Sequence, residues 1–507
     1  MKRLVLITLL LLALRLPAER INQEGRLLGT VPVVTNAILF NTTNADAVVS
    51  ALQIFPVTNP WNECISNRPA LVNSDAMITQ INSDVGSSHR RLSVFQEMNF
   101  VLLPDNQPRV PIDFLSYSDQ SDLDGGTDPY GLYPIPTNLP IETWPTGTGT
   151  QTITQWQTNN NGSDRHAIMV EPGSGFFWET WETVFTNANW EAANGAKFDL
   201  NTNALRPDGW TSGDAAGFPM FPALVRYDEC ERGMVEHACR LVVVHTRNQH
   251  IYPATHNTSG YTGTNYPAMG QRLRLKASYV IPSTWTKEEK ALLLGLKKYG
   301  AMVSDNSSSF FSISVTPDDR WPANAFDDLN SSPGLTINNF EVIQTTGPNE
   351  GPRSAGAPVA NAGSDQTIPY GQTANLAGFI SFTNPATVIQ WQLYSGPGTV
   401  TFGNKALTNT TATFSTSGVY TLELSANDSI HAVAYDAVVI TVTNTIRASL
   451  TRAGTNLNLS WTGGTAPYTV QQATALPAAW SDLITMNGTN YLLAPTNTAR
   501  FFRIKGQ

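Results

Sequence analysis

Residues 358–443 carry the pattern that most restricts the fold of this 507-residue chain. Short runs alternate apolar and polar residues, and turns rich in Gly, Pro, Asn and Ser separate them. The runs that begin at Tyr420 and Val438 are examples. Alternation with a period of two puts one side of each strand in a core and the other in water. The stretch therefore predicts one compact β-sandwich, with Trp391 as its central aromatic residue.

Three segments of this stretch resemble a known module: ANAGSDQT, WQLYSGPGTVTF and YTLELSAND. They are similar to the PKD-type immunoglobulin-like (Ig-like) module of bacterial surface proteins. That resemblance implies a spacer or binding appendage, so we expect the main activity to lie upstream of it. Residues 446–507 follow, with the strand-like runs LNLSW, PYTVQQA and ARFFRIK. They resemble a fibronectin-III-like C-terminal module of secreted bacterial proteins.

Residues 1–18 have the three parts of a secretory signal peptide. A basic MKR start precedes the apolar run LVLITLLLLAL, and Leu16, Pro17 and Ala18 form a small-residue cleavage site. The apolar run is too short to span a bilayer, and no longer run follows it. We therefore expect a secreted or cell-surface protein without a membrane span.

The first large region, residues 20–347, ends at a Gly/Pro/Ser-rich linker at residues 348–357. Two helices are predicted in it, one starting at the capping residue Ser74 and one over 287–299. Thr286 and Glu289 form a capping box for the second helix, and Gly300 ends it. Strand patterns cover residues 165–170, 238–244, 273–280 and 310–315. The chain is thus predicted to be mainly β, with a sandwich or jelly-roll-like first region, helical insertions and two Ig-like modules.

The charge and composition narrow the class of partner. The formal net charge is −9, and acidic and basic residues are interspersed. Nucleic-acid binding requires a basic stripe, so we expect no nucleic-acid partner. The chain has 12 Trp and 15 Tyr together with many Asn residues. These side chains suit an extracellular polysaccharide, which is the partner we expect for a monomeric protein.

Motifs between residues 164 and 321 resemble a family of secreted proteins of actinobacteria and related bacteria. The motifs include DRHAIMV, RPDGWTSGDAAGFPMFPALVRYDE, YPAMGQRLRLKAS and PDDRW. This resemblance implies no particular reaction. The site must therefore be inferred from the chemistry of the residues.

Carboxylates and histidines gather in the same part of the chain, which favours acid–base chemistry on a glycosidic bond. Hydrolysis of that bond requires two carboxyl groups, one protonated and one ionised. The residues predicted to be catalytic are Asp214, Asp228, Glu229, His237 and His256. Glu179 is a further candidate carboxyl group. Asp214 lies in a Gly-rich turn, where the backbone can approach a ligand.

The residues predicted to bind substrate are Trp210, Arg226, Tyr227, Arg240, Arg272 and Lys276. Arg272, Arg274 and Lys276 alternate along one strand, so their cations share one face. That face would also suit elimination on a uronate chain, with a His as the base. A solvated face, or pairing with nearby carboxylates, is the simpler interpretation. Asp305 and His431 are expected to lie outside the site.

Several alternatives stay open. The predicted function is a carbohydrate-active hydrolase or lyase without a resident cofactor, and the alternative is a non-catalytic adhesin or glycan-binding protein. A divalent metal held by histidines such as His166, His245 or His250 is a weaker possibility, because the spacing matches no metal motif. Cys230 and Cys239 could form a disulfide that leaves Cys64 unpaired, or all three could be buried thiols.

Overall fold

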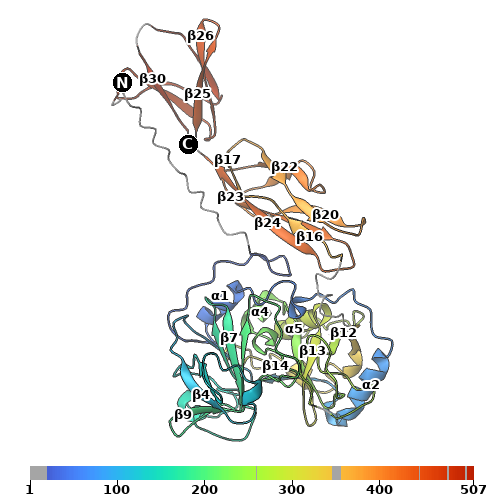
Figure 1. The fold of residues 1–507 in the computed structure, drawn as a ribbon. Helices are drawn as coiled ribbons and strands as arrows, with labels where there is room; N and C mark the ends of the chain where they lie inside the picture. Colours follow the sequence, from blue (N-terminus) through green and yellow to red (C-terminus); the bar gives the residue numbers. More distant parts are fainter. Residues whose placement is uncertain are drawn as a thin grey trace, which may run out of the picture.

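The computed structural model describes residues 20–258, 260–344, 356–444, 446–476, 479–496 and 499–506 (Figure 1). Thirty strands and six α-helices lie in these residues, which confirms the predicted mainly-β class. The predicted signal peptide and residues 348–355 of the predicted linker lie outside them. No helix in the described ranges has the length and apolar character needed to cross a membrane.

The first region contains all six helices and three sheets. The helices are α1 (Thr43–Ala51), α2 (Ser74–Asp84), α3 (Ile153–Gln157), α4 (Tyr227–Arg232), α5 (Lys287–Lys298) and α6 (Asp327–Asn330). A five-stranded sheet has the order β1 (Ile38–Leu39), β3 (Val101–Leu102), β6 (Ala167–Glu171), β7 (Phe176–Trp181) and β10 (Asn194–Asp199). A six-stranded sheet has the order β15 (Phe340–Val342), β12 (Arg272–Leu275), β13 (Ala301–Asn306), β11 (Cys239–Val243), β14 (Phe311–Val315) and β2 (Leu92–Gln96). The third sheet has the order β5 (Tyr130–Tyr133), β4 (Val110–Phe114), β9 (Asn189–Ala192) and β8 (Val184–Thr186).

The five-stranded sheet is buried on both faces. On β6, Ile168 and Val170 pack into the core shared with the six-stranded sheet. Ala167 and Met169 pack into a second core with the four-stranded sheet. Because successive side chains of a strand point to opposite faces, this alternation makes the sheet the middle layer of the region.

Each sheet of the first region mixes parallel and antiparallel pairs. The parallel pairs are β3 with β6, β11 with β13, β14 with β2, and β4 with β9. The strand patterns in the sequence did not indicate these pairings. Parallel neighbours require long connections, and α5 and the loops of this region supply them.

The predicted helix at 287–299 is confirmed, with its end one residue earlier. Thr286 Oγ1 accepts a hydrogen bond from Glu289 N at 3.1 Å, and Glu289 Oε2 accepts one from Thr286 N at 3.0 Å. Gly300 has a φ of +68°, the left-handed conformation that glycine adopts readily after a helix. The helix at Ser74 also forms, but Ser74 does not cap it. Its Oγ instead accepts a hydrogen bond from the backbone N of Val342 at 2.9 Å.

Two local predictions need correction. The strand predicted over 273–280 ends at Leu275, because a turn follows in which Tyr279 N donates to Lys276 O at 3.0 Å. The proposed disulfide is absent, since Cys230 and Cys239 are both unpaired thiols, as is Cys64. Cys230 and Cys239 are buried in the main core, where they act as small apolar side chains.

The C-terminal part is built only from strands. Residues 356–444 contain β16 (Val359–Asn361), β17 (Gln366–Pro369), β18 (Ala374–Ala377), β19 (Phe379–Ser381), β20 (Val388–Ser395), β21 (Val400–Phe402), β22 (Asn409–Phe414), β23 (Gly418–Asn427) and β24 (Ala434–Thr443). Trp391 is fully buried among them, as predicted. Two three-stranded sheets follow, made of β25 (Arg447–Ala453), β26 (Asn456–Thr462), β27 (Tyr468–Ala473), β28 (Ser481–Met486), β29 (Asn490–Leu493) and β30 (Phe501–Lys505).

Candidate functional site

A cavity of about 270 Å³ opens in the first region at the carboxyl ends of β7 and β13. Two loops, around residues 211–215 and 256–258, complete its wall. Its volume is just below the roughly 300 to 1,000 Å³ of typical small-molecule sites. Two aromatic rings, two carboxyl groups and one imidazole line it, and the remaining lining is small and polar. This mixture suits a polar ligand with an apolar face.

The aromatic side chains of the cavity are Tyr117 and Trp181. Their ring centroids are 6.0 Å apart, with an angle of 39° between the planes. Ala193 positions both residues through its backbone: its carbonyl accepts from Tyr117 N at 2.9 Å, and its N–H donates to Trp181 O at 2.7 Å. The two rings thus form a fixed apolar wall, of the kind on which a sugar ring can stack.

A charge cluster joins β11 and β13 beside the cavity. Arg240 donates from Nε to Asp214 at 2.9 Å and from Nη2 to Asp305 at 3.0 Å. The Asp214 side chain is 1% exposed, whereas that of Asp305 is 26% exposed and lines the cavity. Burial, opposed by Arg240 and reinforced by Asp214, raises the pKa of Asp305 to about 6. Asp305 is therefore a carboxyl group that can carry a proton near neutral pH.

The Gly-rich turn predicted to hold Asp214 forms one wall of the cavity. Ser212 Oγ donates to Phe218 O at 2.6 Å and accepts from Asp214 N at 2.9 Å. Gly217 closes the turn with a φ of +74°. Ala216 N donates to Ser304 O at 2.9 Å, which ties the turn to β13. The turn buries Asp214 and leaves Ser212 and Gly213 at the cavity.

His166 supports this turn from behind. Its Nε2 donates to Gly213 O at 2.7 Å, and its Nδ1 lies 3.0 Å from Glu142 Oε2. Burial disfavours the imidazolium, but the Glu142 carboxylate outweighs it and raises the pKa of His166 to about 9. His166 is therefore a buried cation at neutral pH. It fixes the backbone of Gly213 at the cavity wall.

Glu179 holds the end of the same loop. Its carboxylate accepts hydrogen bonds from the backbone N atoms of Met220 and Phe221, each at 2.8 Å. Burial raises the pKa of Glu179 to about 7 against the effect of these two bonds. Glu179 is fully buried and contacts the loop rather than the cavity.

His256 lines the cavity with one nitrogen already engaged. Its Nδ1 lies 2.7 Å from Ala215 O, so Nδ1 carries the proton because a carbonyl can only accept. The neutral ring consequently keeps a lone pair on Nε2, for which the described residues offer no hydrogen-bond partner. His256 can accept a hydrogen bond or a proton from a ligand.

The other predicted acid–base residues lie in a second cluster around α4. Glu229 is bound by Arg226 at 2.8 Å and by His237 at 3.1 Å. Burial would raise the pKa of Glu229, but Arg226 and His237 outweigh it and lower that pKa to about 2. Asp228 pairs with Arg232, and burial raises its pKa. These buried charges neutralise one another.

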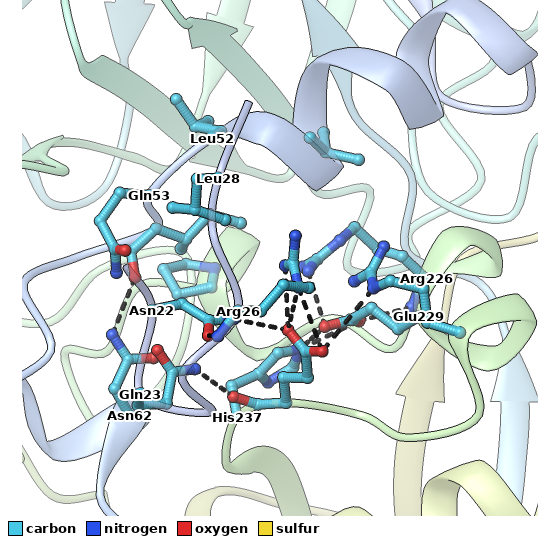
Figure 2. Close-up of a pocket in the computed structure, with 15 residues that line it drawn as sticks. Asn22, Gln23, Arg26, Leu28, Leu52, Gln53, Asn62, Arg226, Glu229 and His237 are labelled. Atoms are coloured by element: carbon cyan, nitrogen blue, oxygen red, sulfur yellow. Dashed lines mark hydrogen bonds and ion pairs between the residues drawn. The ribbon is translucent and has the colours of Figure 1, made fainter. Parts of the chain in front are cut away.

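The N-terminal strap, residues 20–28, covers this cluster (Figure 2). Arg26 and Asn22 bind the carboxylate of Glu236 at 2.9 and 2.8 Å. The remaining cavity between strap and cluster is about 30 Å³, which is room for a water molecule but not for a sugar. The strap also reaches the C-terminal sandwich, where Tyr394 Oη accepts a hydrogen bond from Leu27 N at 2.9 Å.

The remaining predicted substrate-binding residues lie away from the cavity lining. Arg272 is buried and bonded to Glu63 at 3.4 Å and to the carbonyl of Tyr299. Lys276 donates to Asn338 O at 3.0 Å. The basic strand face is therefore paired. The rings of Trp210 and Tyr227 contact the guanidinium groups of Arg206 and Arg320, at 5.5 and 4.1 Å.

The structure thus divides the predicted residues between two places. Asp214, Arg240 and His256 lie at or directly behind the cavity, and the α4 cluster lies under the strap. Asp164, Asp305, Tyr117 and Trp181 line the cavity but were not predicted from the sequence. One signal could have found Asp305: it ends the run AMVSDN, and sites often lie at the carboxyl ends of strands.

No group of three or more His, Cys, Asp or Glu side chains that could hold a metal ion is present in the described part of the chain. His166, His245 and His250 each pair with one carboxylate: Glu142, Asp84 and Asp208, respectively.

Comparison with known proteins places one part of the chain. A family model whose description is that of a PKD domain matches residues 362–442. This stretch is a PKD domain. The match covers β17 to β23 completely and confirms the Ig-like module predicted at 358–443. PKD domains are typical of extracellular proteins, where they serve adhesion or binding.

Similar solved structures cover only small parts of the chain. Domains A168-A170 from titin share 16% identity over 29% of this chain and 59% of that chain, with a TM-score of 0.14. The D00-D0 domain of intimin shares 13% identity over 27% of this chain and 86% of that chain, with a TM-score of 0.16. No curated protein sequence matches the chain.

Proposed function

We propose that this chain is a secreted glycoside hydrolase whose first region binds a carbohydrate in the cavity and cleaves a glycosidic bond there. One observation carries the proposal: a carboxyl group with a pKa of about 6, Asp305, lines the same cavity as the aromatic pair Tyr117 and Trp181. Stacking on the rings would place a sugar, and the carboxyl group would supply the proton that a leaving alcohol requires.

The cavity offers two carboxyl groups in unequal environments. Asp305 is held by a buried cation, while Asp164 is exposed at the opening. Asp305 would donate its proton to the glycosidic oxygen as the bond to the anomeric carbon breaks. Asp164 would take a proton from the attacking water, so that one water is consumed and both products are neutral. His256 Nε2 would accept a hydrogen bond from a sugar hydroxyl.

Elimination on a uronate is less well supported. That reaction needs a cation beside the substrate carboxylate. No Lys or Arg lines the cavity in the described residues, and the three cations of the basic strand face have partners elsewhere. We therefore propose hydrolysis in place of elimination.

The PKD domain supports a second candidate function, a non-catalytic glycan-binding or adhesion protein. In that case the cavity would bind a sugar without cleaving it. The fixed aromatic wall and the polar loop atoms would serve binding equally well.

The two candidates differ in whether new reducing ends appear. The full chain would be incubated with a panel of polysaccharides, and reducing ends and unsaturated uronates would be measured. Hydrolysis predicts reducing ends without unsaturated uronates for at least one substrate. Binding of a polysaccharide without any cleavage would favour the adhesion candidate. Unsaturated products would contradict the proposal of hydrolysis.

A further inference from the structure

We propose that the cavity prefers a sugar that carries a positive charge, namely a hexosamine with an unacetylated amino group. This inference rests on the proposed function, because it names the substrate class of the same cavity. The side chains at the opening supply the first argument. Asp164 and Asp305 are the charged residues among those that line it, and neither Lys nor Arg accompanies them within the described residues.

The buried groups behind the cavity do not reverse this sign. Arg240 is a single cation shared by two carboxyl groups, Asp214 and Asp305. The next pair inward, His166 with Glu142, is neutral in sum because imidazolium and carboxylate are in contact. An anionic sugar in the cavity would therefore meet negative charge without a compensating cation.

The aromatic wall supplies an independent argument. An ammonium group within about 6 Å of an aromatic face is attracted by the ring's electron distribution. Tyr117 and Trp181 present such faces beside Asp164 and Asp305. Aromatic faces next to carboxylates are an arrangement that binds amines, whereas the apolar face of a sugar ring can use the same wall. Both parts of a hexosamine would thus find a partner.

The test compares two sugars that differ only in this charge. Binding of the full chain to an oligosaccharide of β-1,4-linked glucosamine would be measured by calorimetry near pH 6, beside the fully N-acetylated oligosaccharide of equal length. We expect the glucosamine chain to bind about ten- to a hundredfold more tightly, as for hydrogen bonds to charged groups. An Asp164→Asn variant should lose most of that difference. Asp319→Asn, at an exposed carboxylate outside the cavity, should keep it.

Equal or tighter binding of the N-acetylated chain would overturn the inference about charge, and the proposed hydrolase function would stand if that sugar is cleaved. Tighter binding of a polyuronate would also overturn it. If the protein neither binds nor cleaves any oligosaccharide of the panel, the proposed function fails and this inference fails with it. Addition of salt should weaken glucosamine binding and leave N-acetylglucosamine binding unchanged.

Discussion

Arg240 Nη2 lies 3.0 Å from Asp305 Oδ2, and this contact fixes a strongly perturbed carboxyl group that reaches the cavity. The same guanidinium binds Asp214, which is buried behind it. The second carboxyl group raises the pKa of Asp305, and Arg240 limits that rise. The pair of aspartates around one arginine thus sets both the position and the protonation of Asp305.

Asp305→Asn should abolish most turnover on any substrate that the panel identifies. A positioned general acid contributes about a hundred- to ten-thousandfold in rate, and the amide cannot donate a proton to the leaving oxygen in the same way. Initial rates and circular dichroism would be measured together. The matched control is Asp319→Asn, an exposed carboxylate outside the cavity, which should keep the wild-type rate. Equal rates for the two variants would remove Asp305 from the mechanism.

The hydrolysis rate should fall as the pH rises through about 6. Asp305 must be protonated to act as the acid, and its pKa of about 6 means that the protonated fraction falls above this value. Asp214, Arg240 and His166 are the charged groups that influence it. Well above the pKa, the rate should fall about tenfold per pH unit. A rate that increases from pH 6 to pH 8, in a protein shown to stay folded, would contradict the assignment of the acid.

The ion pair of His166 and Glu142 should make stability decrease at alkaline pH. The pKa of His166 is raised from 6.5 to about 9 in the folded chain. Its contribution is therefore complete below pH 6.5 and is lost as the pH rises through about 9. Glu142→Gln leaves a buried cation unpaired and should cost about 3 to 5 kcal/mol at pH 6. Urea unfolding at several pH values checks both. An unchanged midpoint for the variant would show that the pair contributes little.

His237→Ala should lower stability but keep most of the turnover, because His237 lies under the N-terminal strap and not at the cavity. The variant loses a hydrogen bond to the buried Glu229, which should cost about 1 to 3 kcal/mol. His256→Ala is the matched comparison at the cavity, and there turnover should fall while stability changes little. Loss of turnover in His237→Ala with full stability would return His237 to the catalytic residues predicted from the sequence.

The sequence predicts local structure where one pattern decides it. The capping box at Thr286 and the glycine at Gly300 define α5 because both act within a few residues. The alternation around Trp391 defines the PKD domain for the same reason. The order of strands in the mixed sheets depends on long-range packing, which no short pattern contains. The pairing of β11 with β13, which brings Arg240 close to Asp305, is an example.

The candidate site was harder to predict for the same physical reason. Asp214 and His256 were found because a Gly-rich turn and a polar loop mark them. Asp305 was expected to lie outside the site, because a carboxylate before a serine-rich loop usually faces solvent. Its role depends on a register shift between Leu241 and Val242, which lies within the pairing of β11 and β13. Such a shift is not visible in the amino-acid sequence.

The most direct test of the account is a crystal structure of the Asp305→Asn protein with an oligosaccharide that the wild-type protein cleaves. The account predicts a sugar ring against Tyr117 and Trp181, with a glycosidic oxygen within hydrogen-bond distance of the side chain at position 305. An oligosaccharide bound under the N-terminal strap or on the PKD domain, with the cavity empty, would contradict it.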